Sequence, residues 1–117
     1  MIHHVVVMKF KPGVGDVDVE ELERILDDLP NSIIEIQTLE FGRDIIRSRQ
    51  SFDYAVLSLF ANPETLARCQ QYPAYQAVKQ LIGKLSQRIV TVDFQAADAG
   101  SIAADTLVLP GQTLDRL

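Results

Sequence analysis

Two segments of this sequence are apolar on both faces of the strand that each predicts, and this limits the fold more than any other feature. Residues 2–10 contain three consecutive β-branched valines, with apolar residues at odd and even positions. Residues 53–60 form a second, nearly continuous apolar run. A strand that is apolar on both faces is usually covered on both faces. The fold must therefore cover both sides of the sheet that contains these strands.

A helix is predicted after the first strand, over residues 17–29. Its apolar positions form a single stripe, typical of a surface helix, at Leu22, Ile25, Leu26 and Leu29. Asp18, with Glu21 three residues later, fits a capping box, and Asp16 is the alternative cap. Pro30 is expected to end this helix, because proline disrupts a helix interior.

The rest of the chain continues to alternate strands and helices. A strand, the second apolar strand, two helical segments and a closing strand are predicted at residues 33–42, 53–60, 63–71, 73–85 and 88–94. Asn62 and Pro63 favour a helix start, as a capping residue followed by proline in the first turn. Pro73 stops one helical segment and can start the next.

This order, β-α-β-β-α-β, is the ferredoxin-like plan of the α+β class. It predicts a four-stranded antiparallel sheet with the helices on one face, over residues 1–95. The other face would be bare, so a second copy of the same sheet is the simplest cover, and we expect a homodimer that forms an α/β barrel. Residues 96–117 would be a tail that either packs on the dimer partner or covers the mouth of a cavity, with residues 107–109 as a candidate short strand.

Composition and charge exclude several classes of function. The net charge is −5 and there is no long basic run, which argues against binding to nucleic acid or to an anionic membrane surface. No apolar run approaches the roughly 20 residues of a membrane span, and no signal peptide is recognisable. Cys69 is the only cysteine, so a cytoplasmic location is expected. No metal motif or cofactor loop is found, so neither group is expected.

Four short segments carry a resemblance to a known family. They are His4-Val5-Val6-Val7-Met8-Lys9-Phe10-Lys11, Asp53-Tyr54-Ala55-Val56, Tyr72-Pro73-Ala74-Tyr75 with Leu66 before it, and Val92-Asp93-Phe94. In order and spacing the chain resembles the stress-responsive α/β-barrel (Dabb) domain family over about residues 2–95. The resemblance implies a dimeric α+β barrel with a small cavity between sheet and helices in each subunit.

The family includes a plant polyketide cyclase, and the resemblance places its catalytic positions on this chain. The cyclase-like members carry a His-Pro-x-His motif whose second histidine is the base, beside a tyrosine one helical turn earlier. Here those histidine positions are Tyr72 and Tyr75, and the tyrosine position is Cys69. The histidine of the first strand is retained as His4. The resemblance therefore implies the place of a cavity, while the base of the cyclase is missing.

His4 and Tyr75 are the candidate catalytic residues. His4 shares a strand face with the apolar residues at even positions, and it could be a base or a ligand anchor near neutral pH. Tyr75 is aimed along the same helix face as Val78 and Ile82, where its hydroxyl could orient a carbonyl or phenol. The alternative for both is a buried side chain whose polar atoms are satisfied internally. His3 points to the opposite face, so the two histidines cannot share a metal.

Tyr72 and Cys69 complete the expected ligand cavity. Tyr72 has the same alternative as Tyr75, and Cys69 is most simply a small buried hydrophobe. Arg43, Arg47 and Arg49 could clamp a carboxylate or phosphate. The simpler interpretation of these arginines is a solvated hairpin loop that pairs with Asp44 or with a partner subunit.

Two hypotheses of different class follow. The first is a small-molecule-binding or interaction domain whose partner is a small hydrophobic or aromatic ligand. The second is an enzyme that acts on a small aromatic or polyketide-like compound, with His4 and Tyr75 as base and acid. The absence of the family's base favours the first hypothesis, and the retained strand histidine favours the second.

Overall fold

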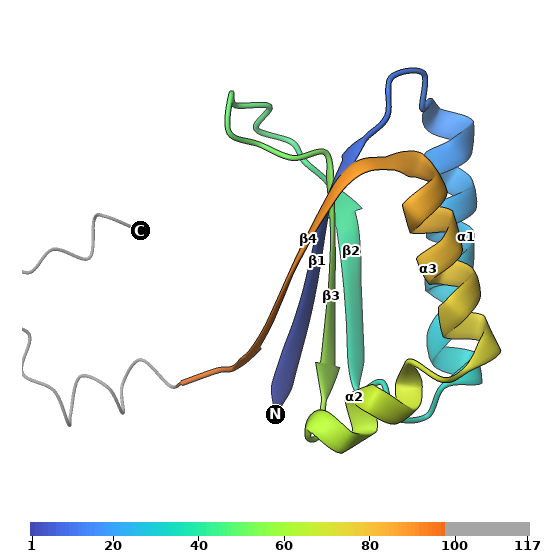
Figure 1. Cartoon of the computed structure of the whole chain (residues 1–117), viewed down its shortest axis with the longest axis vertical. Coiled ribbons are helices and arrows are strands. Elements are labelled where there is room, and N and C mark those ends of the chain that lie inside the picture. Colours follow the sequence, from blue (N-terminus) through green and yellow to red (C-terminus); the bar gives the residue numbers. More distant parts are fainter. Residues whose placement is uncertain (98–117) are drawn as a thin grey trace, which may run out of the picture.

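One four-stranded antiparallel sheet forms a single layer in the computed structural model, which describes residues 1–97 (Figure 1). The elements are β1 (Ile2–Phe10), α1 (Asp16–Ser32), β2 (Thr38–Arg43), β3 (Tyr54–Phe60), α2 (Pro63–Cys69), α3 (Pro73–Leu85) and β4 (Ser86–Gln95). The strand order is β2-β3-β1-β4, so β1 is central and β4 is an edge. Helices α1 and α3 lie on one face of the sheet, and α2 lies at one end. The predicted α+β, ferredoxin-like fold is confirmed.

The core lies between the inner face of the sheet and the two long helices. Side chains alternate along β3, where Tyr54, Val56, Ser58 and Phe60 point inward and are buried. On β1, Met8 is fully buried, and His4 is 7% exposed on the same face. The buried stripe of α1 contacts this face through Val19, Leu22, Leu26 and Leu29.

Helix α1 differs from the prediction at both ends. It continues through Pro30 to Ser32, and the amide of Ile33 closes it by donating to the carbonyl of Leu29 at 3.2 Å. The extra turn brings Ile33 into the core, where it is fully buried, while Pro30 stays exposed. This burial offsets the cost of a proline within the last turns of the helix.

The start of α1 also corrects the predicted cap. Gly13 has a positive φ of 89°, and the turn that it makes places Gly15 at the N-cap position. The amide of Gly15 donates to the carboxylate of Asp18 at 3.0 Å. Neither Asp16 nor Asp18 is therefore the N-cap residue, because Asp18 lies three residues inside the helix and acts from there.

The starts of β2 and β4 also differ from the prediction. Strand β2 begins at Thr38, because residues 33–37 form a turn that buries Ile33 and Ile36 instead of extending the sheet. Strand β4 begins at Ser86, directly after the last residue of α3. Helix and strand are thus joined without a loop.

The outer face of the sheet is apolar and open in the single chain. On β4, Val90, Val92 and Phe94 are 39%, 57% and 43% exposed. The ring of His3 stacks on that of Phe94, with the ring centroids 4.9 Å apart. No helix within the described residues has both the length and the apolar character that crossing a membrane requires. The candidate strand at residues 107–109 and most of the predicted tail lie outside the described residues.

Adjacent isoleucines test where the core ends. Ile33→Ala should lower the free energy of unfolding by about 2–5 kcal/mol, because it removes a fully buried side chain. Ile34→Ala is the matched control, since Ile34 is 90% exposed and the change should stay within about 0.5 kcal/mol. Urea unfolding measures both variants. Equal effects would contradict the packing described for the end of α1.

Candidate functional site

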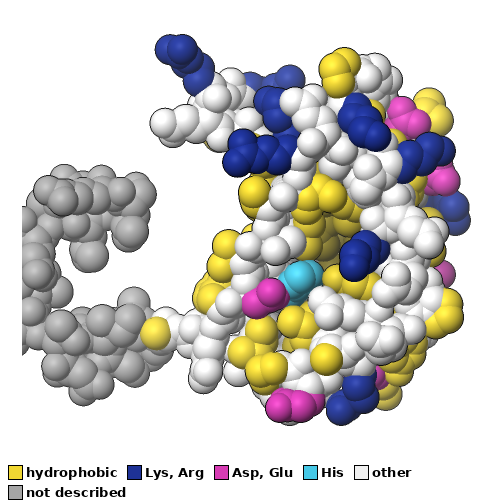
Figure 2. All heavy atoms as spheres, in the orientation of Figure 1, with side chains coloured by type: hydrophobic (Ala, Val, Ile, Leu, Met, Phe, Trp, Pro, Cys, Tyr) yellow, Lys and Arg dark blue, Asp and Glu magenta, His cyan; other side chains and the backbone are white. Residues whose placement is uncertain are grey.

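A cavity of about 280 Å³ lies between the inner face of the sheet and the helices. Most of its wall is apolar, with residues from β1, β3, β4, α1 and α3. Figure 2 shows its opening as a hollow with hydrophobic side chains inside and with histidine, acidic and basic side chains at the rim. The polar groups gather around His4, which makes this the candidate ligand site.

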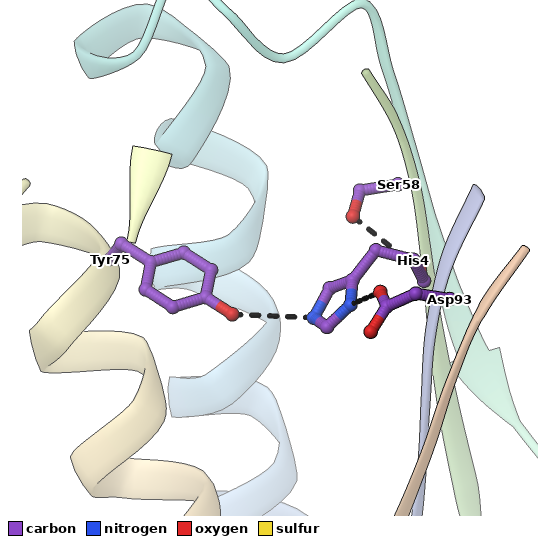
Figure 3. A network of polar contacts seen from close by, with 4 residues as sticks. All are labelled: His4, Ser58, Tyr75 and Asp93. Atoms are coloured by element: carbon purple, nitrogen blue, oxygen red, sulfur yellow. Dashed lines mark hydrogen bonds and ion pairs between the residues drawn. The ribbon is translucent and has the colours of Figure 1, made fainter. Parts of the chain in front are cut away.

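Strand register brings three polar side chains from three neighbouring strands into one row. His4 on β1 is paired with Ser58 on β3 and with Asp93 on β4. All three face inward, where they line the cavity. Tyr75 reaches the same place from α3 (Figure 3). The structure therefore brings together the two catalytic candidates, His4 and Tyr75, that the sequence suggested.

The imidazole of His4 is held at both ring nitrogens. Its Nδ1 is hydrogen-bonded to the carboxylate of Asp93, and its Nε2 lies 3.3 Å from the hydroxyl oxygen of Tyr75 (Figure 3). A carboxylate can only accept, so Nδ1 carries a proton in this arrangement. In the neutral ring, Nε2 then accepts from the Tyr75 hydroxyl. Ser58 donates its hydroxyl to the backbone carbonyl of His4 at 3.5 Å.

Tyr75 is a hydrogen-bond donor at this site. Burial raises the pKa of its hydroxyl above the ordinary value of about 10, and a hydrogen bond with Gln70 opposes that rise only in part. The hydroxyl therefore stays protonated at neutral pH. It can donate to a carbonyl or phenol oxygen. It cannot act as the base for which the resemblance would require a histidine at this position.

Tyr72 lies apart from the cavity, which corrects its expected place. It precedes Pro73 in extended conformation, as the N-cap residue of α3, so it does not share the helix face of Tyr75. Its hydroxyl donates to the carboxylate of Glu35 at 2.8 Å. Tyr72 therefore links α3 to the turn after α1, and of the two tyrosines only Tyr75 lines the cavity.

Cys69 forms part of the cavity wall at the end of α2, where it is fully buried. Burial, followed by the charge of Glu35, raises the pKa of its thiol to about 11. The thiol is therefore neutral near pH 7. This agrees with the interpretation of Cys69 as a small buried hydrophobe.

The three arginines lie away from the cavity. Arg43 pairs with the carboxylate of Asp16 at 2.6 Å, linking the end of β2 to the start of α1. The backbone amide of Arg47, which has a positive φ of 59°, donates to the carboxylate of Asp44 at 2.7 Å. Arg49 is exposed. These contacts agree with the interpretation of a solvated loop stabilised by nearby acids.

Asp93 is the site residue that sequence reasoning missed. A signal was present, because Val90, Val92 and Phe94 share one face of the closing strand and Asp93 must face the other way. That face points toward the core, so an acid on it is expected to have a hydrogen-bonding or ionic partner.

Within residues 1–97, the side chains of His, Cys, Asp and Glu form no group of three or more that could hold a metal.

Comparison with known proteins assigns the family. The sequence pattern of the family described as the Stress responsive A/B Barrel Domain matches residues 2–96. The chain belongs to this family. No curated protein sequence matches this barrel domain significantly.

Solved structures share the fold of this stress-responsive A/B barrel domain. A dimeric ferredoxin-like protein of unknown function from Thermobifida fusca has a TM-score of 0.75 at 24% identity, over 81% of this chain and 90% of that one. A second such protein, from Bacteroides fragilis, has a TM-score of 0.72 at 19% identity, over 81% and 95%.

An enzyme has the same fold. Hydroxynitrile lyase from Passiflora edulis has a TM-score of 0.75 at 16% identity, over 84% of this chain and 94% of that one. At such identities the likeness shows the fold alone. Since its structural neighbours include proteins of unknown function as well as an enzyme, the specific role of this stress-responsive A/B barrel domain is unassigned.

The thiol of Cys69 should be inert in the folded protein at pH 8. With its pKa raised to about 11, almost none of it is the reactive thiolate, and the side chain is fully buried. Labelling with Ellman's reagent should therefore be slow in native buffer and should accelerate as the pH rises. The same protein in guanidinium chloride is the control, where labelling should be rapid. Rapid labelling of the folded protein at pH 8 would contradict this burial.

Proposed function

We propose that this stress-responsive A/B barrel domain binds one compact, mainly apolar molecule that carries a hydroxyl or carbonyl oxygen. The observation that carries the proposal is the meeting of His4 and Tyr75 in a cavity whose remaining wall is mostly apolar. Ligand sites commonly combine an apolar wall with a few convergent polar groups. The apolar wall would bind the body of the ligand, and the polar pair would orient its oxygen.

The volume of the cavity limits the size of the ligand. At about 280 Å³ it lies near the lower end of the range of about 300–1,000 Å³ for ligand pockets. An aromatic ring with a short chain suits this space. A small hydrophobic or aromatic compound is therefore the proposed partner, and nucleic acid and membranes are not.

The contact between Tyr75 and His4 favours a phenol or a carbonyl as the bound oxygen. At 3.3 Å it is longer than the usual O–H···N or O–H···O hydrogen bond, so a ligand oxygen can replace it at small loss. A carbonyl would accept from the Tyr75 hydroxyl. A phenol could accept from Tyr75 and donate to Nε2 of His4, so it would restore both contacts.

The compound 4-propylphenol tests this proposal. Tyr75→Phe should weaken its binding about fivefold, the effect of roughly 1 kcal/mol for one lost hydrogen bond. Tyr72→Phe is the matched control and should change little, because that hydroxyl bonds Glu35 outside the cavity. Isothermal titration calorimetry measures the affinities. Equal losses in the two variants, or no binding to the wild type, would refute the proposed orientation of the ligand.

A second candidate function is an acid–base enzyme that acts on a small aromatic or polyketide-like compound. The contact between Asp93 and Nδ1 of His4 favours it, since a carboxylate there orients the ring and stabilises the imidazolium formed when Nε2 takes a proton. In this candidate function His4 is the base and Tyr75 the donor. Turnover of a bound ketone that His4→Ala abolishes would support the enzyme, and binding without turnover would leave the binding domain.

We further propose that the protein is a homodimer joined through the outer face of the sheet. Val92 and Phe94 on β4 are exposed there, and Val5 and Val7 on the outer face of β1 are only partly buried. An apolar sheet face of this kind typically marks an interface. Two structural neighbours are described as dimeric, which supports the proposal.

A charged residue on the outer face tests the dimer. Val92→Asp should shift the protein toward the monomer in sedimentation velocity, because a carboxylate would be buried against the apolar partner face. Val17→Asp on α1 is the control, since Val17 is 79% exposed on the opposite side of the molecule. A wild-type protein that sediments as a monomer at micromolar concentration would refute the proposal.

Two further proposals concern the cellular compartment and the domain boundaries of the protein. We place it in the reducing cytoplasm, because the chain has one cysteine and can form no internal disulfide. We also propose that residues 1–95 are the domain and that residues 96–117 form a tail packed on the partner subunit.

A further inference from the structure

The cavity opens between α3 and the edge strand β4. Its lining includes Tyr75, Val78 and Lys79 from α3, and it includes Thr91 and Asp93 from β4. The side chain of His4 is only 9% exposed, whereas that of Asp93 is 48% exposed. Depth therefore increases from Asp93 to His4, and the mouth lies on the side of Asp93.

Lys79 lies on the opposite side of this mouth. It follows Tyr75 by four residues on α3, so the two side chains share one face of the helix. It lines the cavity and is exposed. Figure 2 shows a basic side chain at the rim of the hollow, facing the acidic and histidine side chains across it.

Asp93 and Lys79, the two charged groups at the mouth, differ in whether they have an ion-pair partner. The carboxylate of Asp93 is paired with Nδ1 of His4, which offsets its charge. Within residues 1–97, no carboxylate lies within ion-pair distance of the Lys79 ammonium. As far as the described residues go, its three N–H donors therefore have no carboxylate partner and can meet a group in the mouth.

We propose that Lys79 selects ligands with a carboxylate, so that the cavity takes a compact aromatic acid. The phenol-type oxygen lies at Tyr75 and His4, and the carboxylate lies at the mouth beside Lys79. This inference rests on the proposed function and names the ligand class of the same site. It makes Lys79 a specificity-determining residue. Neither the exposed position of Lys79 nor the family resemblance indicated that role.

A carboxylate fits this mouth better than a phosphate. One ammonium is present, and the other charged side chain that lines the mouth is the acid Asp93. A phosphate carries nearly two charges and usually meets several cationic or backbone donors. A carboxylate carries one charge, and a single charge-assisted hydrogen bond from Lys79 can meet it.

Two probes that differ only at the acid test the proposal. They are 3-(4-hydroxyphenyl)propanoic acid and 3-(4-hydroxyphenyl)propanamide, titrated by calorimetry at low ionic strength. The wild type should prefer the acid by roughly fivefold, the size expected of one partly exposed ion pair. Lys79→Gln should abolish this preference, so that the acid and the amide bind the variant with equal affinity. The preference in the wild type should also decrease as salt is added.

Lys84→Gln is the matched control, because Lys84 is also exposed on α3 and does not line the cavity. It removes the same charge and should keep the preference for the acid. A preference that survives Lys79→Gln, or that Lys84→Gln removes equally, would overturn the role of Lys79. Equal binding of acid and amide to the wild type would overturn it and leave the proposed function standing. If neither probe nor 4-propylphenol binds, both proposals fail.

Discussion

The register of β1 with both of its neighbours is the constraint on which the site depends. β1 is the central pairing partner of β3 and β4, so His4 has a fixed partner residue on each side. A shift of one residue would turn His4 to the outer face and separate it from Asp93 and Tyr75. The apolar residues at even positions of β1 hold this register, since the same shift would expose Met8. Core packing and the polar site are thus fixed by one alignment.

The buried histidine is stable because each of its ring nitrogens has a partner. An imidazole in an apolar cavity without hydrogen bonds would destabilise the fold, as buried polar groups do. Asp93 and Tyr75 provide those bonds from an edge strand and from a helix, which are the two walls of the mouth. The same arrangement that satisfies His4 in the free protein holds the groups that a ligand would meet. The hydrogen bonds that stabilise the buried His4 therefore also hold the site in one arrangement before a ligand binds.

Sequence reasoning was most successful where the signal is local. The apolar runs and the helix breaks gave the order of elements, and helical spacing aimed Tyr75 toward the strand that carries His4. Tyr72 was expected in the cavity because it occupies the first histidine position of the family motif, whereas in the structure it precedes the first turn of α3 and leaves the helix face of Tyr75. Asp93 was missed because its partner is 89 residues away and is reached only through strand register. Such pairings need tertiary alignment, which local patterns do not carry.

The junction between α3 and β4 has a consequence for how the cavity can open. Leu85 ends the helix, Ser86 begins the strand, and the amide of Lys11 donates to the carbonyl of Leu85 at 2.8 Å. Helix α3 and strand β4, the two walls of the mouth, therefore diverge from this junction. Tyr75 and Asp93 lie on them at the end farther from it. Because helix and strand meet there without a loop, the width of the mouth depends on how α3 is held at its other end, where Pro73 begins the helix shortly after α2.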